Sequence, residues 1–363
     1  MSNALNGIQN QIVGNISKII RGNETGLQNK KNGQSDLKGI IKAKSVCAPY
    51  IVPDGKMKKI KQKSNKKVCK AGKCFTRKVK LVESVHENSC LSDEGLMVLV
   101  NAWNKTHPTD KILTRKNESE DRIWIKLKNK LRKYMSEEDL KVEHKWFDLE
   151  FVKQVLGEKK AEEYTDEFYN PEAPDTWKTN INTWLNTTNI NEKMEQYEEK
   201  YPEFKFYGAS PIDFDLKSDS GQCMVNELCN INLNTHVSNG DKFIGVVFNL
   251  DKHNQGGSHW ISMFINLPFQ EINFWDSYGQ KPPQEVIDLI NKLIEQGKNL
   301  KKPIKFKKNI NTRRHQFKSS ECGMYSCNFI IQQLEGKTFK QVCNNIINDD
   351  KMTRKRLDFF TFN

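Results

Sequence analysis

The feature that most constrains this chain is a cysteine directly before a glycine at the start of an apolar helical pattern. Cys322 and Gly323 open a run whose apolar residues recur at helical spacing as far as Leu334. The free N–H groups and the positive dipole end of a helix stabilise a thiolate at such a position. Gln316, six residues earlier, has an amide that can donate to an oxyanion, and Gly323 leaves room for a substrate carbonyl. The stretch therefore predicts a nucleophilic cysteine.

A base and an orienting carboxylate for this thiol lie upstream. His259 opens one apolar, strand-like run, and Asp276 ends a second one 17 residues later. Two such runs joined by a short connection form an antiparallel hairpin, which would bring the imidazole and the carboxylate to the same end of a sheet. The sequence therefore predicts Cys322 as nucleophile, His259 as general base and Asp276 as the group that orients the base. The alternative is a core histidine, a strand-end aspartate and a buried thiol that are unrelated.

Other residues are rivals for these roles. His253 stands in a polar loop six residues before His259, which favours His259 as the base. His315 is next to Gln316, and we expect it on the surface. Cys327 lies five residues into the helix and is expected to be a packing thiol. Cys322 and His259 therefore remain the predicted nucleophile and base.

The order His-Trp, Asp-Ser and Gln-x5-Cys-Gly resembles the ubiquitin-like-protein protease superfamily, which includes SUMO-deconjugating enzymes and adenovirus endopeptidase. This resemblance covers about residues 243–335. Segments 90–94, 204–214 and 245–251 are further similar to the polyprotein proteases of large cytoplasmic DNA viruses, such as African swine fever virus and the poxviruses. The resemblance implies an α+β fold with a papain-like cysteine protease core, in which helices flank a central sheet.

The same resemblance implies a cysteine endopeptidase that cleaves viral structural precursors after small residues, commonly a Gly-Gly pair, during virion maturation. It places the protein at virus assembly sites in the host cytoplasm and in the virion. It also implies that Trp260 walls the substrate channel beside Gly323. Gln316 and the N–H of Cys322 are expected to hold the oxyanion, and the chemistry needs no metal or organic cofactor.

Two alternatives stay open. One is a protease that removes SUMO- or ubiquitin-like modifiers, for which the helical domain would be the docking surface. The other is a non-enzymatic, nucleic-acid-associated core protein with a degenerate protease fold. An intact set of four catalytic residue types argues against the second alternative.

Positive charge is concentrated at the N-terminus. Residues 1–80 hold 19 Lys and Arg against 3 Asp and Glu, whereas the rest of the chain holds 39 against 42. The segment has few aromatic residues and is predicted to be flexible. Twelve basic residues and no acidic one fall between Lys56 and Lys80, a run that suits nucleic acid or an acidic partner, or else a solvated linker. If residues 46–80 only target or dock the enzyme, a chain starting near Lys80 is expected to fold and cleave normally. The alternative is that they pack on the helical domain through Val68, Phe75, Val79 and Leu81, so that their removal would expose apolar surface.

A second basic run leads into the predicted site. Residues 298–318 hold nine Lys and Arg and no acidic residue. A positive field there would favour the thiolate and attract an acidic substrate. The alternative is an exposed strand edge that lysines protect from aggregation.

The chain after the basic segment is predicted to divide into two domains. Residues 81–200 indicate a helical domain, with a helix capped by Ser92, another ending near Gly157, an acidic loop over 158–172 and helix spacing over 177–185. Residues 201–363 indicate the catalytic domain, with strands near 204–207, 243–250, 261–267, 272–275 and 304–310.

Cysteine usage and hydropathy limit the remaining possibilities. Nine cysteines without regular spacing or a secretory signal predict reduced thiols. Cys69, Cys74 and His86 have the wrong spacing for a zinc site. No apolar run approaches the length needed to cross a bilayer.

Overall fold

The computed structural model describes residues 44–49, 51–52, 65–70, 73–78, 82–85 and 89–362. Every described residue belongs to one compact unit, Ala43–Asn363. Most of the predicted flexible segment 1–80, and about half of the basic run within it, therefore lie outside the described residues.

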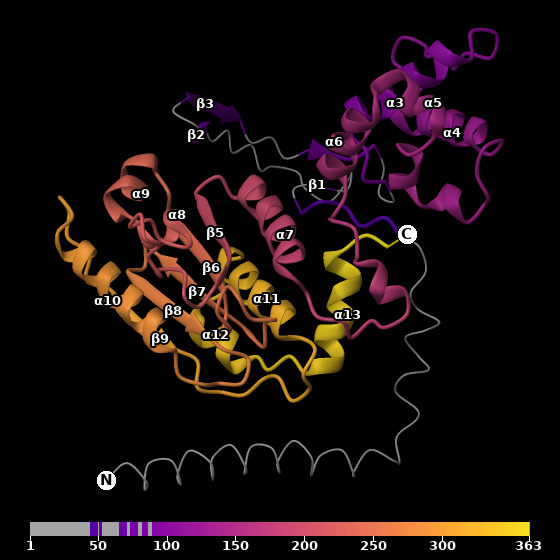
Figure 1. Cartoon of the computed structure of the whole chain (residues 1–363). Coiled ribbons are helices and arrows are strands. Elements are labelled where there is room, and N and C mark those ends of the chain that lie inside the picture. The colour runs from indigo at the N-terminus through magenta and orange to yellow at the C-terminus, as the bar shows by residue number, and fades with distance from the viewer. Residues whose placement is uncertain are drawn as a thin grey trace, which may run out of the picture. The chain divides into compact units, whose positions relative to one another are not determined.

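A mixed five-stranded sheet forms the centre of the C-terminal half (Figure 1). Its strands, which neighbour one another in chain order, are β5 (Phe204–Pro211), β6 (Phe243–Asn249), β7 (Trp260–Asn266), β8 (Glu271–Trp275) and β9 (Lys307–Ile310). The outer pairs β5–β6 and β8–β9 are parallel, and the two inner pairs are antiparallel. The predicted β7–β8 hairpin and the α+β class with a central sheet are confirmed.

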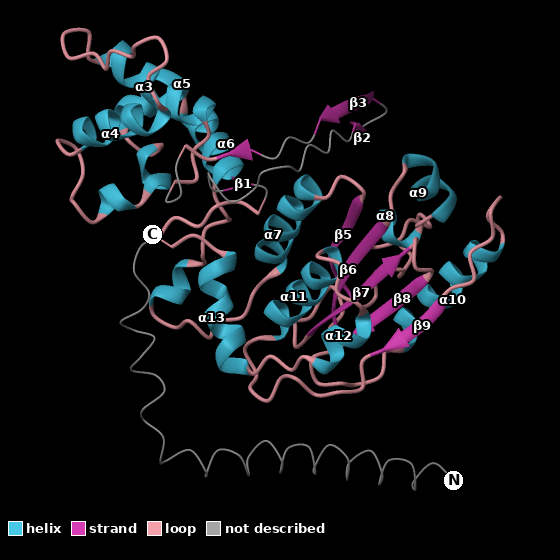
Figure 2. Cartoon of the chain, turned by 180° about the vertical axis from the view of Figure 1, so that it is seen from behind, coloured by secondary structure: helices cyan, strands magenta, loops and turns pink. Residues whose placement is uncertain are grey.

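Both faces of the sheet are buried, because alternate residues of its inner strands are apolar on each side. Ile244, Val246 and Phe248 of β6 join one core with the apolar side of α10 (Gln284–Lys298). On the other face lies α11 (Cys322–Leu334), the predicted nucleophile helix, whose Phe329 stacks on Trp275 with ring centroids 5.2 Å apart (Figure 2). The sheet thus fixes the position of α11.

The helix that precedes the sheet packs against it. Helix α7 begins after Asn186, whose side chain accepts the N–H of Asn189, and contacts both β5 and α11. The boundary proposed at residue 200 stays a prediction, but α7 packs with the elements that follow it. The helices of this half, besides α10 and α11, are η3 (Asp175–Lys178), α7 (Thr187–Lys200), α8 (Asn226–Cys229), α9 (Leu233–Asn239), α12 (Phe339–Asn344) and α13 (Asp349–Phe359).

A second apolar core belongs to the helices that come before. Ser92 caps the first of them as predicted, since its Oγ accepts the N–H of Gly95 at 3.2 Å. Gly157, with φ of 81°, ends another where expected. The helices are α3 (Asp93–Thr106), α4 (Glu120–Leu131), η1 (Asp139–Lys141), η2 (Glu143–Trp146), α5 (Glu150–Leu156) and α6 (Glu158–Phe168).

Two local predictions in this region are wrong. The acidic stretch expected to be a loop forms α6, because its charges lie on the exposed side while Ala161 and Phe168 are buried. The stretch 177–185, expected to be helical, contains only the last residues of η3. Trp177 is buried, and its Nε1–H donates to the carbonyl of Thr183 at 3.1 Å. This hydrogen bond folds the segment back on itself.

Residues just before the helical region are held in place. Val46 donates its N–H to Thr361 Oγ1 at 3.2 Å and accepts the N–H of Asn170 at 2.6 Å. Ala48 and Ile51 are 1% and 6% exposed within the helical core. Residues 44–49 and 51–52 therefore differ from the flexible segment that the composition predicts.

Cysteine pairing also differs from the sequence prediction. Among the cysteines whose side chains the structure describes, two disulfides join Cys47 to Cys90 and Cys223 to Cys229, while Cys322, Cys327 and Cys343 are free. The first pair lies 43 residues apart, and only the packing of residues 44–49 brings its Cα atoms to 5.1 Å. The expectation of reduced thiols is thus wrong for these four cysteines.

Short strands complete the described N-terminal segments. They are β1 (Ile51–Val52), paired parallel with β4 (Val82–Glu83), and the hairpin of β2 (Asn65–Lys70) with β3 (Lys73–Lys78). None of the described helices combines the length and the apolar content needed to cross a membrane.

Candidate active site

The imidazole of His259 and the carboxylate of Asp276 meet at one end of the sheet. His259 directly precedes β7 and Asp276 directly follows β8, and Ser262 pairs with Trp275 in the antiparallel register. The Nε2 atom of His259 lies 2.7 Å from Oδ1 of Asp276, and both residues are buried. This contact occupies Nε2, so Nδ1 is the nitrogen left to face another partner.

The turn after β8 fixes the carboxylate of Asp276. Its Oδ1 also accepts the N–H of Tyr278 at 2.9 Å, and its Oδ2 accepts the N–H of Gln280 at 3.1 Å. Gly279 lies between them with φ of 73°, and a Cβ there would come within 2.9 Å of the backbone of residues 312 and 313. Only glycine fits this turn without strain.

Cys322 opens α11 beside His259. As the first helical residue it has no partner for its N–H within the helix. The thiol of Cys322 lies near enough to the imidazole of His259 to raise the pKa of the ring. Burial lowers the pKa of His259, but the hydrogen bonds and charges of Asp276 and Cys322 outweigh it and raise the pKa to about 9. A protonated imidazole is therefore favoured next to the thiol at neutral pH.

The amide of Gln316 is completely buried and held at both ends. Its Oε1 accepts the hydroxyl proton of Ser277 at 2.7 Å, and its Nε2 donates to the carbonyl of Lys318 at 2.6 Å. The N–H of Gln316 also donates to the carbonyl of Ser277 at 3.0 Å. Because Ser277 follows Asp276, one dipeptide contacts both the candidate base and the candidate oxyanion donor.

Trp260 and Gly323 are neighbours across the start of α11. A Cβ on Gly323 would lie 3.3 Å from Cδ1 of Trp260 and 3.0 Å from Cβ of Leu185. The indole Nε1–H of Trp260 donates to the carbonyl of Leu185 at 2.9 Å. Gly323 is thus required for close packing beside the thiol, a role that adds to the one predicted from the sequence.

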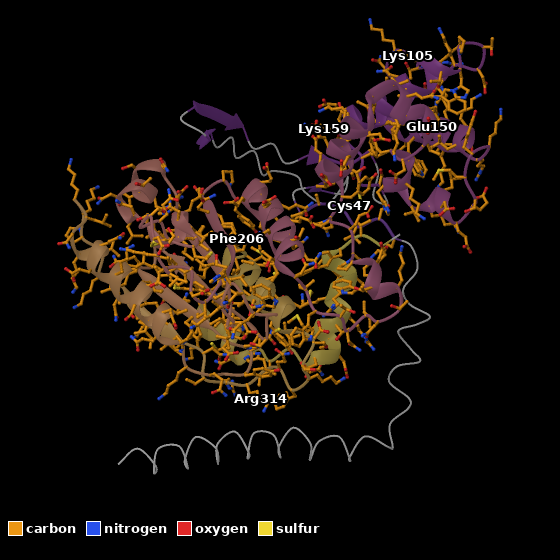
Figure 3. The ribbon with its side chains drawn as sticks, in the orientation of Figure 1. Cys47, Lys105, Glu150, Lys159, Phe206 and Arg314 are labelled. Atoms are coloured by element: carbon orange, nitrogen blue, oxygen red, sulfur yellow. A yellow bond between two sulfur atoms is a disulfide. The ribbon has the colours of Figure 1, made fainter. Side chains whose placement is uncertain are left out.

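Three contributors to this region were missed from the sequence: Leu185, Ser277 and Tyr278. Tyr278 stacks on His259 with ring centroids 4.5 Å apart. Arg314, labelled in Figure 3, lies 5.3 Å above the ring of Tyr278 and 4.9 Å from that of the exposed Phe317. The Asp-Ser dipeptide was a usable signal for Ser277, whereas Leu185 and Tyr278 carried none.

The rival residues lie in other environments. His253 contacts Asp213, with Nδ1 and Oδ2 2.7 Å apart, which supports the choice of His259. Cys327 is buried, and desolvation raises the pKa of its thiol to about 12. His315, expected on the surface, is instead 2% exposed and packs against Trp275.

Within the described residues, no group of three or more His, Cys, Asp or Glu is arranged to hold a metal ion.

This arrangement matches a known family. Residues 181–361 fit the family described as the Ulp1 protease family, C-terminal catalytic domain. The chain belongs to the Ulp1 protease family. The matched span contains every candidate site residue, from His259 to Gly323, and the protein is a cysteine protease.

Its relatives among known proteins are viral. A thiol protease of Acanthamoeba polyphaga mimivirus is 29% identical over 286 residues, which are 75% of this chain and 89% of the relative. A cysteine protease of African swine fever virus is 26% identical over 188 residues, 49% of this chain and 68% of the relative. In another isolate of that virus the corresponding relative is named SUMO-1 cysteine protease. The predicted likeness to proteases of large DNA viruses is confirmed.

A solved structure supports the fold. The crystal structure of the African swine fever virus protease aligns with a TM-score of 0.52 at 18% identity, covering 90% of this chain and 99% of that one. An alignment over 90% of the chain extends beyond the sheet into the helices that precede it, and it supports the fold.

Proposed function

We propose that this protein is a thiol endopeptidase that cleaves viral structural precursors after small residues, commonly Gly-Gly, during virion maturation. The observation that carries the chemistry is the buried contact of His259 with Asp276 beside Cys322. The viral origin of the relatives supports the substrate class and an action at virus assembly sites and in the virion.

The first half of the mechanism forms an acyl-enzyme. Cys322 attacks the scissile carbonyl carbon as a thiolate, paired with the imidazolium of His259 that carries a proton on Nδ1. The carbonyl electron pair moves to the oxygen, which accepts hydrogen bonds from the Nε2–H of Gln316 and the N–H of Cys322. As the carbon–nitrogen bond breaks, Nδ1–H of the imidazolium protonates the leaving amine.

The second half releases the product. Neutral His259 removes a proton from water, whose oxygen attacks the thioester carbonyl at the same oxyanion site. The carbon–sulfur bond breaks and returns the thiolate beside the imidazolium. Asp276 keeps Nε2 of the ring in place through both halves, and no metal or organic cofactor takes part.

Crowding around the thiol supports a preference for small residues. A side chain at the position of Gly323 would meet Leu185 at 3.0 Å and Trp260 at 3.3 Å. A substrate chain that passes Trp260 toward Cys322 has little room for side chains there, which suits glycine. The polypeptide partners are therefore precursors with small-residue cleavage sites, while a nucleic-acid or acidic partner for the basic run from Lys56 to Lys80 stays a prediction.

A modifier-deconjugating activity is the second candidate. The name SUMO-1 cysteine protease for a relative favours it. The substrate distinguishes the two, because a folded modifier needs a docking surface whereas a precursor loop needs only the channel. A non-enzymatic core protein is not supported by the intact site.

The test uses the full chain and three variants. Cys322→Ala and His259→Ala should abolish cleavage of a viral structural precursor, whereas Cys327→Ala should retain most of it. Mass spectrometry of the products should place the cut after Gly-Gly. Faster cleavage of SUMO conjugates than of the precursor would favour deconjugation, and unchanged turnover by the Cys322→Ala protein would refute the proposed site.

A further inference from the structure

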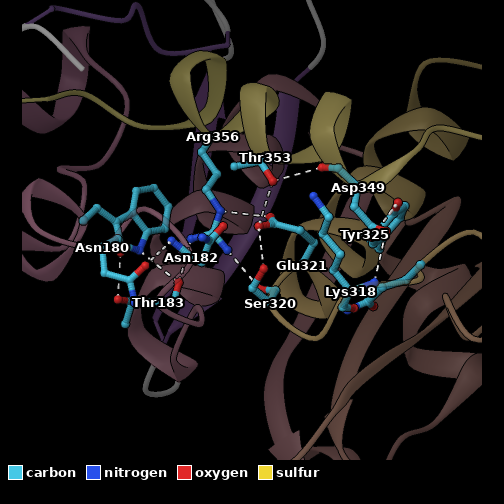
Figure 4. Close-up of polar contacts among 12 residues, drawn as sticks. Asn180, Asn182, Thr183, Lys318, Ser320, Glu321, Tyr325, Asp349, Thr353 and Arg356 are labelled. Carbon is cyan, nitrogen blue, oxygen red and sulfur yellow. Dashed lines mark hydrogen bonds and ion pairs between the residues drawn. The ribbon is translucent and has the colours of Figure 1, made fainter. Parts of the chain in front are cut away.

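One helix contacts almost the entire loop that connects Gln316 to Cys322. Asp349, Thr353 and Arg356 of α13 are spaced by four and three residues, so they project from the same side of the helix. All three side chains are buried. They face residues 317–321, and their contacts are drawn in Figure 4.

Asp349 holds the loop at its Gln316 end. Its Oδ2 accepts the backbone N–H groups of Phe317 at 2.9 Å and Lys318 at 3.0 Å. The carbonyl of the same Lys318 accepts the Nε2–H of Gln316 at 2.6 Å. A single carboxylate therefore fixes the backbone that in turn directs the amide of Gln316.

Arg356 and Thr353 hold the loop at its Cys322 end. The Nε of Arg356 lies 2.9 Å from Oε2 of Glu321, and its Nη2–H donates to the carbonyl of Ser320 at 2.9 Å. The Oγ1 of Thr353 lies 3.1 Å from the other carboxylate oxygen, Oε1. Glu321 immediately precedes Cys322, and both members of the Arg356–Glu321 ion pair are fully buried.

The same guanidinium reaches a third segment. Its Nη1–H donates to the carbonyl of Thr183 at 2.6 Å, and its centre lies 4.4 Å from the ring of Trp177. Two residues after Thr183, the carbonyl of Leu185 accepts the indole N–H of Trp260. Arg356 thus links the segment that accepts the indole N–H of Trp260 to the residue before the nucleophile.

A buried ion pair of this kind is a weak source of stability, because removing two charges from water costs about as much as their attraction returns. Its geometric effect is larger, since the planar fork of arginine fixes several acceptors at once. We propose that Asp349, Thr353 and Arg356 are positioning residues. They hold the oxyanion donor and the nucleophile at the two ends of the loop in the relative positions that the reaction needs. This inference rests on the proposed roles of Gln316 and Cys322.

Two conservative variants test it, with a matched control. Arg356→Lys keeps the charge but loses the fork, and Thr353→Val keeps the shape but loses the hydroxyl. The control is Arg354→Lys, the same arginine-to-lysine change at an exposed position of the same helix. We expect kcat to fall roughly 10- to 100-fold for Arg356→Lys, because small misplacements of reacting groups are costly. We expect a smaller loss for Thr353→Val, with KM within about twofold for both and no change for the control.

Two inhibitors report on the site itself. A peptide aldehyde that forms a hemithioacetal needs the oxyanion donors, whereas alkylation by iodoacetamide needs only the thiolate. Aldehyde affinity should fall in parallel with kcat, by more than the rate of alkylation falls. All assays are run below the melting temperature of each variant.

The outcomes separate the two proposals. If Cys322→Ala is inactive while Arg356→Lys and Thr353→Val match the wild type in kcat and aldehyde affinity, the positioning inference is overturned and the proposed function stands. A lower melting temperature with unchanged kcat overturns it equally, and Thr353→Val decides the matter if Arg356→Lys does not fold. An active Cys322→Ala protein would instead refute the function.

Discussion

At the scale of single residues, the charge of His259 depends on two neighbours that act against burial. An imidazole removed from water loses its proton more readily. Asp276 holds one ring nitrogen and Cys322 faces the ring as well, and together they raise the pKa to about 9. The ring therefore keeps its proton through the neutral range, which is what an imidazolium paired with a thiolate requires.

The first prediction concerns this pKa. Removing one partner with Cys322→Ala should lower the pKa of His259 below that of the wild type, because Asp276 alone then opposes burial. NMR titration of the imidazole Cε1–H measures it directly, and His253, which contacts Asp213, is an internal control in the same spectra. An unchanged midpoint would show that the thiol does not interact with the ring.

The second prediction follows from the same shift by linkage. The folded chain binds the His259 proton up to about pH 9, whereas the unfolded chain releases it near 6.5. The stabilisation from this group is fully present below pH 6.5 and is lost as the pH rises to about 9. Denaturant unfolding of wild type and His259→Gln should show that the stability advantage of the wild type falls as the pH rises through this window. A difference independent of pH would contradict the shift.

The third prediction concerns Ser277. Ser277→Ala removes the hydroxyl that orients Gln316, so kcat should fall about tenfold with little change in KM, as expected for one hydrogen bond of about 1.4 kcal/mol. Ser258→Ala is a matched control, since Ser258 is an exposed serine next to His259 that contacts Asp251 instead. Peptide turnover measures both. A pure KM effect would place Gln316 in substrate binding.

Residue types and their order predicted that His259 and Asp276 lie close together, and their side chains are 2.7 Å apart. Strand ends and a helix start are positions that a sequence pattern indicates. Leu185 and Tyr278 were not predictable in this way. Each reaches the site through a turn whose direction depends on contacts made far away in the chain.

At the scale of elements, hydrophobic spacing predicted the strands and the nucleophile helix well, since each of them is buried on the side that the pattern indicates. Hydrophobic spacing gave wrong predictions for two mostly polar segments, 158–172 and 177–185. The acidic α6 buries only Ala161 and Phe168 at its ends, and the tryptophans of 177–185 mimic helical spacing although one of them folds back on a local carbonyl.

The fourth prediction tests the packing of the inner strand β6. A Cβ at Gly245 would lie 2.9 Å from two ring atoms of Phe204, so Gly245→Ala should destabilise the protein by about 1–3 kcal/mol. Gly256→Ala is the control, because nothing lies within 4 Å of its Cβ position. Thermal unfolding compares them. Equal melting temperatures would mean that Phe204 moves aside without cost.

At the scale of the whole molecule, segments distant in sequence meet near the C-terminus. The backbone of Lys44 pairs with that of Phe362, and Asn170 donates its side-chain N–H to the carbonyl of Asp358 at 2.9 Å. The disulfide of Cys47 with Cys90 closes a further loop. Composition assigned residues 44–49 to a flexible basic segment, because average charge does not reveal single backbone pairings.

The last prediction separates the two parts of that segment. A chain that starts at Lys44 keeps Ala48, Ile51 and the disulfide, and should unfold at the wild-type temperature. A chain that starts near Lys80 loses them. Burial of Ile51 is worth about 2 kcal/mol and closure of the disulfide loop about 4 kcal/mol, so this chain should be markedly less stable.

Thermal unfolding and peptide turnover of the two shortened chains decide this point. If both match the full chain, residues 44–79 only target the enzyme, as the charge distribution alone suggests. If only the chain from Lys80 loses stability, the residues around Cys47 belong to the fold. In that case, if the full chain binds nucleic acid more tightly than the chain from Lys44, residues 1–43 supply the difference. That part of the affinity should weaken steeply as the salt concentration rises.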